Sequence, residues 1–281
     1  DLKNARTRFK YEELFVFMLK MSYLKSRRSH DLGIKRNIDI NKLNETISNL
    51  PFELTVDQKK VINIIYSDLN SDIAMNRLLQ GDVGSGKTIV AFLTMYLNSL
   101  SGYQSALLAP TEILAVQHYN NFKSLFKDSG LSCCLLTGKT PNKEKKKIYS
   151  LLEEGKIDVI IGTHALISEN VVYKNLGLVI TDEQHRFGVK QRENLYNKGF
   201  TPDTLYMSAT PIPRTYAITL YGDMDISSIK TMPKGRKTVV TLLKNNEHIK
   251  DVLELMYEQL KKHHQIYVVS PLIDDDTDEF D

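Results

Sequence analysis

Three glycines and a lysine stand close together in the string GDVGSGKT, residues 81–88. The string follows a short apolar run and precedes a segment with helical periodicity. Glycines let backbone N–H groups turn toward an anion, a helix N-terminus adds partial positive charge, and a lysine adds a full charge. The pattern predicts a phosphate-binding loop, with a glycine-rich helix cap as the alternative. The residues expected to bind nucleotide here are Gly81, Asp82, Val83, Gly84, Ser85, Gly86, Lys87 and Thr88.

A pair of carboxylates, Asp182 and Glu183, follows the apolar run at residues 176–181. Beside a phosphate-binding loop, one carboxylate can hold Mg²⁺ and its neighbour can orient or deprotonate the attacking water. We expect Asp182 and the Thr88 hydroxyl to serve the metal, Glu183 the water, and Lys87 the β- and γ-phosphates. Lys87, Asp182 and Glu183 are therefore the predicted catalytic residues, with ATP and Mg²⁺ as cofactors.

Six apolar runs alternate with helical segments along the middle of the chain and predict its architecture. Such alternation is typical of an α/β fold in which helices cover a mostly parallel sheet, with ligands at the carboxyl ends of the strands. The expected strands lie at residues 76–80, 105–110, 133–138, 158–162, 176–182 and 204–210.

Composition narrows the class of protein but not its partner. The chain has 281 residues, is 42% apolar, and carries a formal net charge of +3, which is too small to argue for nucleic acid. No apolar run approaches the roughly 18 residues that cross a bilayer, and no secretion signal opens the chain, so we expect a cytoplasmic protein with no membrane partner. The adjacent Cys133 and Cys134 are interpreted as buried thiols.

Several motifs resemble those of superfamily 2 helicases. DEQH at residues 182–185 is similar to their DExH box, and MSATPIPRT at residues 207–215 is similar to their Ser-Ala-Thr motif. The longer strings at residues 75–88, 181–192 and 209–227 resemble the RecG family of bacterial helicases, which remodel stalled forks and Holliday junctions in recombination and repair. The resemblance implies a RecA-like domain in which His185, Ser208 and Thr210 couple the nucleotide site to DNA.

The resemblance also implies contacts with the base and with DNA. Gln58 would hydrogen-bond the adenine edge with Phe52 near the base, although Thr55-x-x-Gln58 is also a helix capping box that needs no ligand. In the family, three stretches track the backbone of one DNA strand, so branch structure rather than base sequence would select the substrate. The corresponding residues here are Pro110, Thr111, Gly138, Thr163 and His164. His118, His263 and His264 lack metal-ligand spacing and are interpreted as surface or structural residues.

The family pattern divides the chain into three parts. We expect a helical arm and linker at residues 1–50, a first RecA-like ATP-binding domain at 51–232, and a linker with an incomplete second domain at 233–281, including strands at 238–243 and 265–271. The chain begins without methionine and resembles only part of the family pattern, so we expect a fragment. Arginines of the second domain would then be missing, so this monomer would bind ATP but hydrolyse it slowly.

Two other functions stay open from the sequence. A transcription-repair coupling translocase shares most of these motifs but typically reads DEEQRFGV where this chain reads DEQHRFGV. The chain could also be a P-loop kinase or a transporter ATPase acting on a small molecule. In that case DEQH and SATPIPRT would be chance matches.

Overall fold

The computed structural model describes residues 2–28, 32–183, 187, 194–209, 224–233, 239–245 and 248–269. The chain divides into two compact units, residues 1–234 and 235–281, which are treated separately here. This division does not separate residues 1–50 from 51–232, and the three-part division of the sequence stays a prediction.

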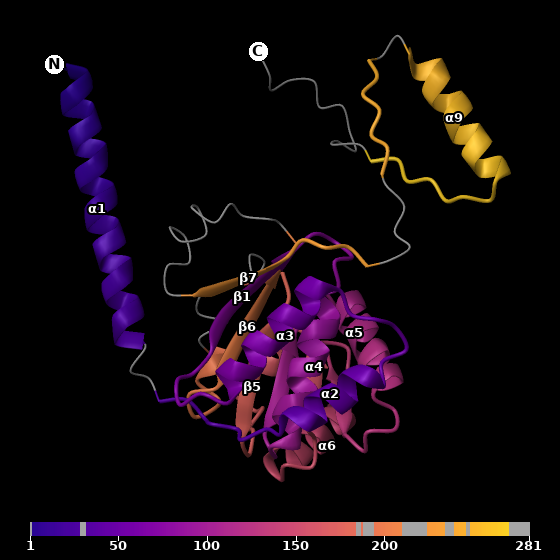
Figure 1. The fold of residues 1–281 in the computed structure, drawn as a ribbon. Helices are drawn as coiled ribbons and strands as arrows, with labels where there is room; N and C mark the ends of the chain where they lie inside the picture. Colours follow the sequence, from indigo (N-terminus) through magenta and orange to yellow (C-terminus); the bar gives the residue numbers. More distant parts are fainter. Residues whose placement is uncertain are drawn as a thin grey trace. The chain divides into compact units, whose positions relative to one another are not determined.

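The first unit is built on one parallel sheet (Figure 1). Every described strand pair in it is parallel, in the order β3-β4-β2-β5-β6-β1-β7. The strands are β1 Asn76–Gly81, β2 Gln104–Leu108, β3 Cys133–Leu136, β4 Val159–Gly162, β5 Leu176–Thr181, β6 Asp203–Ser208 and β7 Asp225–Ile229. The predicted α/β fold with a parallel sheet is confirmed, and each of the six predicted strands is present. The edge strand β7 was not predicted, since its sequence DISSI has only two apolar residues.

Helices cover both faces of this sheet. The first unit contains α1 Leu2–Arg28, which contributes no described residue to either core of the sheet, and α2 Ile40–Ser48, α3 Val56–Leu69, α4 Lys87–Leu100, α5 Glu112–Leu125, α6 Asn142–Glu153 and the short 3-10 helix η1 His164–Ile167. Helices α2 to α5 gather on one side of the strands in Figure 1 and share one hydrophobic core with them. Helix α6 and η1 contribute to a second core.

The strands alternate between these two cores because successive side chains of a strand point to opposite faces. In β2, Leu107 belongs to the core of α2 to α5, whereas Ala106 and Leu108 belong to the core of α6. In β4, Val159 and Ile160 divide in the same way. Both faces are therefore apolar, which explains the continuous apolar runs by which these strands were predicted.

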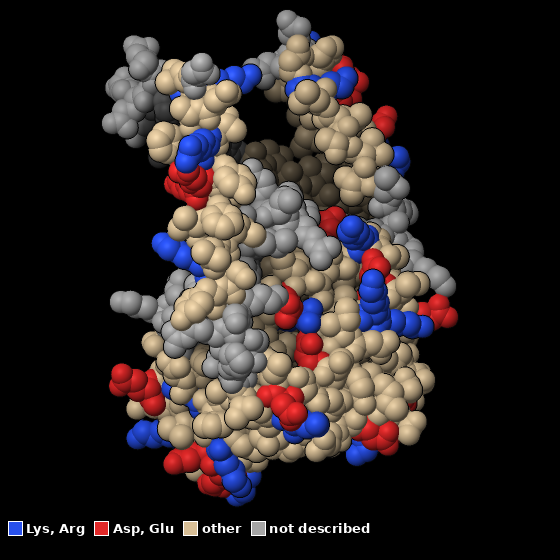
Figure 2. Space-filling view, turned by 60° about the vertical axis from the view of Figure 1, so that its left-hand side comes forward, with Lys and Arg blue, Asp and Glu red and all other residues tan. Residues whose placement is uncertain are grey.

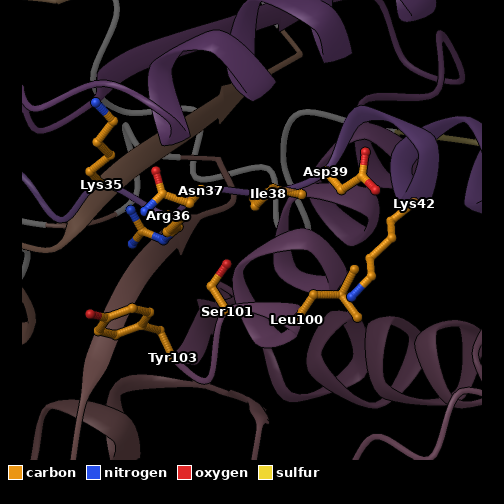
Figure 3. A pocket seen from close by; sticks show the side chains of 9 residues that line it. All are labelled: Lys35, Arg36, Asn37, Ile38, Asp39, Lys42, Leu100, Ser101 and Tyr103. Atoms are coloured by element: carbon orange, nitrogen blue, oxygen red, sulfur yellow. The ribbon is translucent and has the colours of Figure 1, made fainter.

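Arg36 joins the segment before α2 to the sheet. It is only 2% exposed, forms an ion pair with Asp203 at the start of β6, and donates a hydrogen bond to Asn98 Oδ1 at 2.6 Å. Its guanidinium lies 5.3 Å from the ring centroid of Tyr103, at the edge of a cavity of about 350 Å³ (Figure 3). The partners of Arg36 come from distant parts of the chain, so the residue fixes their relative positions.

Helix α1 lies in the part of the chain predicted to be a helical arm. Its large apolar side chains, such as Tyr11 and Phe15, are exposed. None of the helices in the described ranges combines the length and apolar character that crossing a bilayer requires.

The second unit contains α9 Ile249–Lys261. Residues 239–245 and 265–269 form no strand, so the described parts of the predicted strands at 238–243 and 265–271 are not observed as such. A strand needs a neighbour to satisfy its backbone groups, and the described residues of this unit supply none.

Candidate nucleotide site and nucleic-acid interface

The loop between β1 and α4 has the conformation that its glycines predict. Gly84 and Gly86 have positive φ angles of 78° and 87°, a region that residues with a Cβ rarely adopt. A Cβ on Gly86 would lie 2.1 Å from Gln58 Nε2, and one on Gly81 would lie 2.4 Å from Ser85 Oγ. Helix α4 begins directly after the loop without a side-chain cap, so its first N–H groups face the loop.

Lys87 lies across this loop. Its side-chain nitrogen Nζ donates hydrogen bonds to the carbonyl oxygens of Gly81, at 2.7 Å, and Asp82, at 3.1 Å. Burial lowers the pKa of Lys87, while the charges of Glu183, Asp182 and Asp82 act in the opposite direction. The acidic pair follows β5 and the loop follows β1, so both lie at the carboxyl edge of the same parallel sheet.

Three hydrogen bonds hold Asp182. Its backbone N–H donates to Leu108 O at 2.9 Å, its Oδ1 accepts from the Glu183 N–H at 3.0 Å, and its Oδ2 lies 2.9 Å from His118 Nε2. Glu183 has a φ angle of 47°, an uncommon conformation for a residue with a side chain. Thr201 and His263 also have positive φ angles, so this conformation by itself does not mark a functional site.

His118 is a member of this site that sequence reasoning missed. Of the two predicted possibilities, a surface or a structural histidine, burial excludes the first, since the side chain is 6% exposed and contacts a predicted metal carboxylate. A signal was present, because Ala115, His118 and Phe122 recur at helical spacing and all three are buried in α5. The hydrogen bond itself could not be predicted from residue spacing, because Asp182 lies 64 residues away in the sequence.

The predicted coupling residues are described only in part. Ser208 ends β6, the strand that lies between β5 and β1, and pairs in register with Gln80. It is 3% exposed. His185 and Thr210 lie outside the described residues.

Gln58 holds the start of α3 against the loop. Its side-chain oxygen accepts from the Thr55 N–H at 2.8 Å, its own N–H donates to Thr55 Oγ1, and its Nε2 donates to Ser85 O at 2.8 Å. The capping box is therefore confirmed, and the same side chain contacts the loop. Gln58, Thr88 and the half-exposed Phe52 also line a cavity of about 930 Å³.

The residues predicted to contact DNA follow three neighbouring strands. Pro110 and Thr111 come after β2, Gly138 comes after β3, and Thr163 and His164 come after β4. Thr111, Gly138 and His164 are exposed, whereas Thr163 is buried and its hydroxyl has no partner in the described part of the chain. Because carboxyl ends of parallel strands share one edge, these residues lie on the same edge as the loop, toward its β3 end.

Glu112 links two of these stretches. Its carboxylate accepts a hydrogen bond from Thr137 Oγ1 at 2.7 Å and forms an ion pair with Lys139 at 2.8 Å. Thr111 caps the same helix by accepting from the Leu114 N–H. Among the described residues visible in Figure 2, Lys and Arg are interspersed with Asp and Glu.

Comparisons with known proteins agree with this geometry. The chain is 51% identical over 275 residues to proteins named ATP-dependent DNA helicase RecG from Staphylococcus aureus and Staphylococcus epidermidis, and each match covers 98% of this chain and 40% of the relative. A solved structure described as RecG bound to a three-way DNA junction shares 47% identity with a TM-score of 0.86, over 97% of this chain and 37% of that one. The predicted resemblance is confirmed, and the chain spans about 40% of the length of these curated relatives.

The chain also matches a larger family of proteins. Residues 55–218, more than half of the 281, match the DEAD/DEAH box helicase family. The matched range contains the predicted phosphate-binding loop, the acidic pair and Ser208. The family match favours a helicase over the small-molecule kinase that the loop alone left open. The chain belongs to the DEAD/DEAH box helicase family.

Proposed function

We propose that this chain is the ATP-binding motor portion of an ATP-dependent DNA helicase or translocase that remodels branched DNA in recombination and repair. The observation that carries the proposal is the geometry of the sheet edge, where the glycine-rich loop follows β1 and the acidic pair, Asp182 and Glu183, follows β5 of the same parallel sheet. Similar proteins are named DNA helicases, and a similar structure is described as bound to a three-way DNA junction. The protein is expected to work as a monomer in the cytoplasm, where its DNA substrate lies.

The residues of the loop suit a magnesium-bound triphosphate. The missing Cβ at Gly81 and Gly86 lets Ser85 Oγ and Gln58 Nε2 pack directly against the loop backbone, which supports its turned conformation. The Ser85 hydroxyl is fully buried and has no partner among the described residues, and an anion in the loop would satisfy it. Hydroxyl and carboxylate oxygens from Thr88 and Asp182 are the ligands, direct or through water, that Mg²⁺ prefers.

Each side chain then has a defined task. The Lys87 ammonium exchanges its two backbone carbonyl partners for phosphate oxygens, which is a small movement of a flexible side chain. Asp182 would hold Mg²⁺, which would neutralise charge on the phosphates. Glu183 orients or deprotonates the attacking water. Gln58 and Phe52 contact the adenine, and His185, Ser208 and Thr210 couple this site to DNA.

The other end of the same sheet edge supplies the DNA contacts. Pro110, Thr111, Gly138, Thr163 and His164 would contact the backbone of one strand, partly through N–H groups at the start of α5. Backbone contacts carry no direct sequence information, so the shape of the junction selects the substrate. The 281-residue chain by itself is expected to bind ATP but hydrolyse it slowly, since it spans about 40% of its helicase relatives.

An ATPase assay of the full-length protein tests this function. Forked DNA is expected to stimulate hydrolysis strongly, an equal length of linear duplex weakly, and Glu183→Gln is expected to abolish hydrolysis while ATP binding remains. Hydrolysis that no DNA stimulates would contradict the proposal. Equal stimulation by both DNAs without fork unwinding would favour the transcription-repair coupling alternative.

A further inference from the structure

His118 occupies a position that a merely structural histidine does not need. It lies on α5, is 6% exposed, and places Nε2 at 2.9 Å from Asp182 Oδ2. A carboxylate only accepts hydrogen bonds, so Nε2 carries the proton of this contact. The other ring nitrogen, Nδ1, is buried without a partner among the described residues, so the Asp182 contact is the one hydrogen bond that orients the ring there.

Aromatic side chains surround the His118 ring on the side of α4. Phe92 of α4 packs edge-on against the ring, with a centroid separation of 6.2 Å, and Phe122 packs against Phe92. The histidine therefore approaches Asp182 from an aromatic layer between α4 and α5. A hydrophobic residue would fill that layer as well, so packing alone does not explain a histidine here.

The hydrogen bond from His118 restricts the orientation of the Asp182 carboxylate. Oδ1 accepts from the Glu183 N–H and Oδ2 contacts His118, so rotation of the carboxylate would break one or both bonds. Each carboxylate oxygen keeps a further lone pair for a metal or its water. Partners of metal-binding groups of this kind orient the ligand, and their loss typically lowers metal affinity by 10- to 100-fold.

We propose that His118 is a positioning residue that orients the Asp182 carboxylate for the metal of the nucleotide site. The inference rests on the proposed function, because it requires that Asp182 serve Mg²⁺. His118 also lies two helical turns after Thr111, which is the N-cap of α5 and a proposed DNA contact. The hydrogen bond from His118 to Asp182 therefore connects the helix that begins at this DNA contact with the proposed metal ligand.

Metal binding by the 281-residue chain tests the proposal without measuring catalysis. Mn²⁺ is titrated in the presence of a non-hydrolysable ATP analogue and followed by electron paramagnetic resonance. His118→Phe and His118→Met, which remove the donor but keep the bulk, are expected to weaken Mn²⁺ binding by about tenfold. His118→Gln, whose amide nitrogen can replace Nε2, is expected to recover most of the affinity.

A packing control separates orientation from stability. Phe122→Leu disturbs the same aromatic layer without touching Asp182 and is expected to leave Mn²⁺ affinity unchanged, even if thermal stability falls. Binding of the analogue in EDTA is expected to be equal in all variants. Unchanged Mn²⁺ affinity in folded His118→Phe and His118→Met would overturn the proposal. Failure of the unsubstituted chain to bind the analogue at all would instead overturn the proposed nucleotide site.

Discussion

Single residues decide whether the loop at 81–88 can surround an anion. Gly86 combines a positive φ of 87° with a position where a Cβ would meet Gln58 Nε2. Lys87 begins α4 and returns its ammonium to the carbonyl oxygens of the loop, near two carboxylates. Backbone conformation and charge at these two neighbouring positions therefore depend on contacts made far along the chain.

Gly86→Ala is expected to impair the nucleotide site. A residue with a Cβ is disfavoured in this left-handed conformation, so the substitution should lower the free energy of unfolding by about 1–2 kcal/mol. The new Cβ would also clash with Gln58 Nε2 and displace the loop. We expect affinity for an ATP analogue, measured by fluorescence titration, to fall at least tenfold. Gly102→Ala is the matched control, because Gly102 has a φ of 79° but nothing within 4 Å of its Cβ position. Equal loss of affinity in both variants would mean that the effect is one of general stability.

The sequence predicted some residues of this site and not others for a physical reason. The glycines, Lys87 and the acidic pair perform their tasks within short strings, so their types and spacing suffice. His118 does not, because its importance comes from a contact with Asp182 that only the packing of α5 on the sheet creates. Its place on the buried stripe of α5 was readable, but its partner was not.

At the scale of elements, Asp57 connects α3 to the segment after β7. Its carboxylate accepts hydrogen bonds from the N–H groups of Lys230 and Thr231, at 2.9 and 2.8 Å, and from the Thr231 hydroxyl. These bonds lower the pKa of Asp57 below its ordinary value of 3.8. The first turn of α3, next to Gln58, is thereby tied to the chain that leaves the sheet.

Asp57→Asn is expected to lower stability in a pH-dependent way. A carboxylate with a depressed pKa in the folded state stabilises the fold above its unfolded pKa, and this contribution is lost as the pH falls through the folded pKa. We expect a loss of about 1 kcal/mol at pH 7, which shrinks as the pH falls below the ordinary value of 3.8. Urea unfolding at pH 7, 5 and 3.5 measures this difference. A difference that is constant across these pH values would show that the charge of Asp57 is not involved.

Strands with mostly apolar side chains were predictable from the sequence. The polar strand β7 was missed, and an apolar segment without a neighbouring strand in the described part of the chain was wrongly predicted to be a strand. Five of the six runs are almost wholly buried, and that of the edge strand β3 is partly buried, so their apolar character located them. Strand β7 alternates aspartate and serine with two isoleucines and gave no such signal. Residues 239–243 have strand-like composition, yet they form no strand because no neighbour is present for them among the described residues.

At the scale of the first unit, the Arg36–Asp203 pair connects positions 167 residues apart. Burial raises the pKa of Asp203 to about 6, while the charge of Arg36 and hydrogen bonds from Arg36 and Met75 act against that rise. Sequence patterns contain no trace of this pair, because two charged residues in separate polar stretches look like ordinary surface residues. Their burial becomes visible only in the folded structure, where each is 2% exposed.

Arg36→Ala is expected to destabilise the first unit by about 3–5 kcal/mol, because it leaves the Asp203 carboxylate buried without its partner. Urea unfolding followed by circular dichroism measures the loss. Adding Asp203→Asn to this variant removes the unpaired charge and should restore part of the stability. A loss below about 1 kcal/mol for Arg36→Ala would mean that the pair does not hold these segments together.

The nucleotide site itself is tested most directly by binding of an ATP analogue with Mg²⁺ to the 281-residue chain. We expect the unsubstituted chain and Glu183→Gln to bind with similar affinity, since Glu183 acts on water, and Lys87→Ala to lose binding because the phosphates lose their charged partner. Undiminished binding by Lys87→Ala, or no binding by the folded unsubstituted chain, would contradict the account.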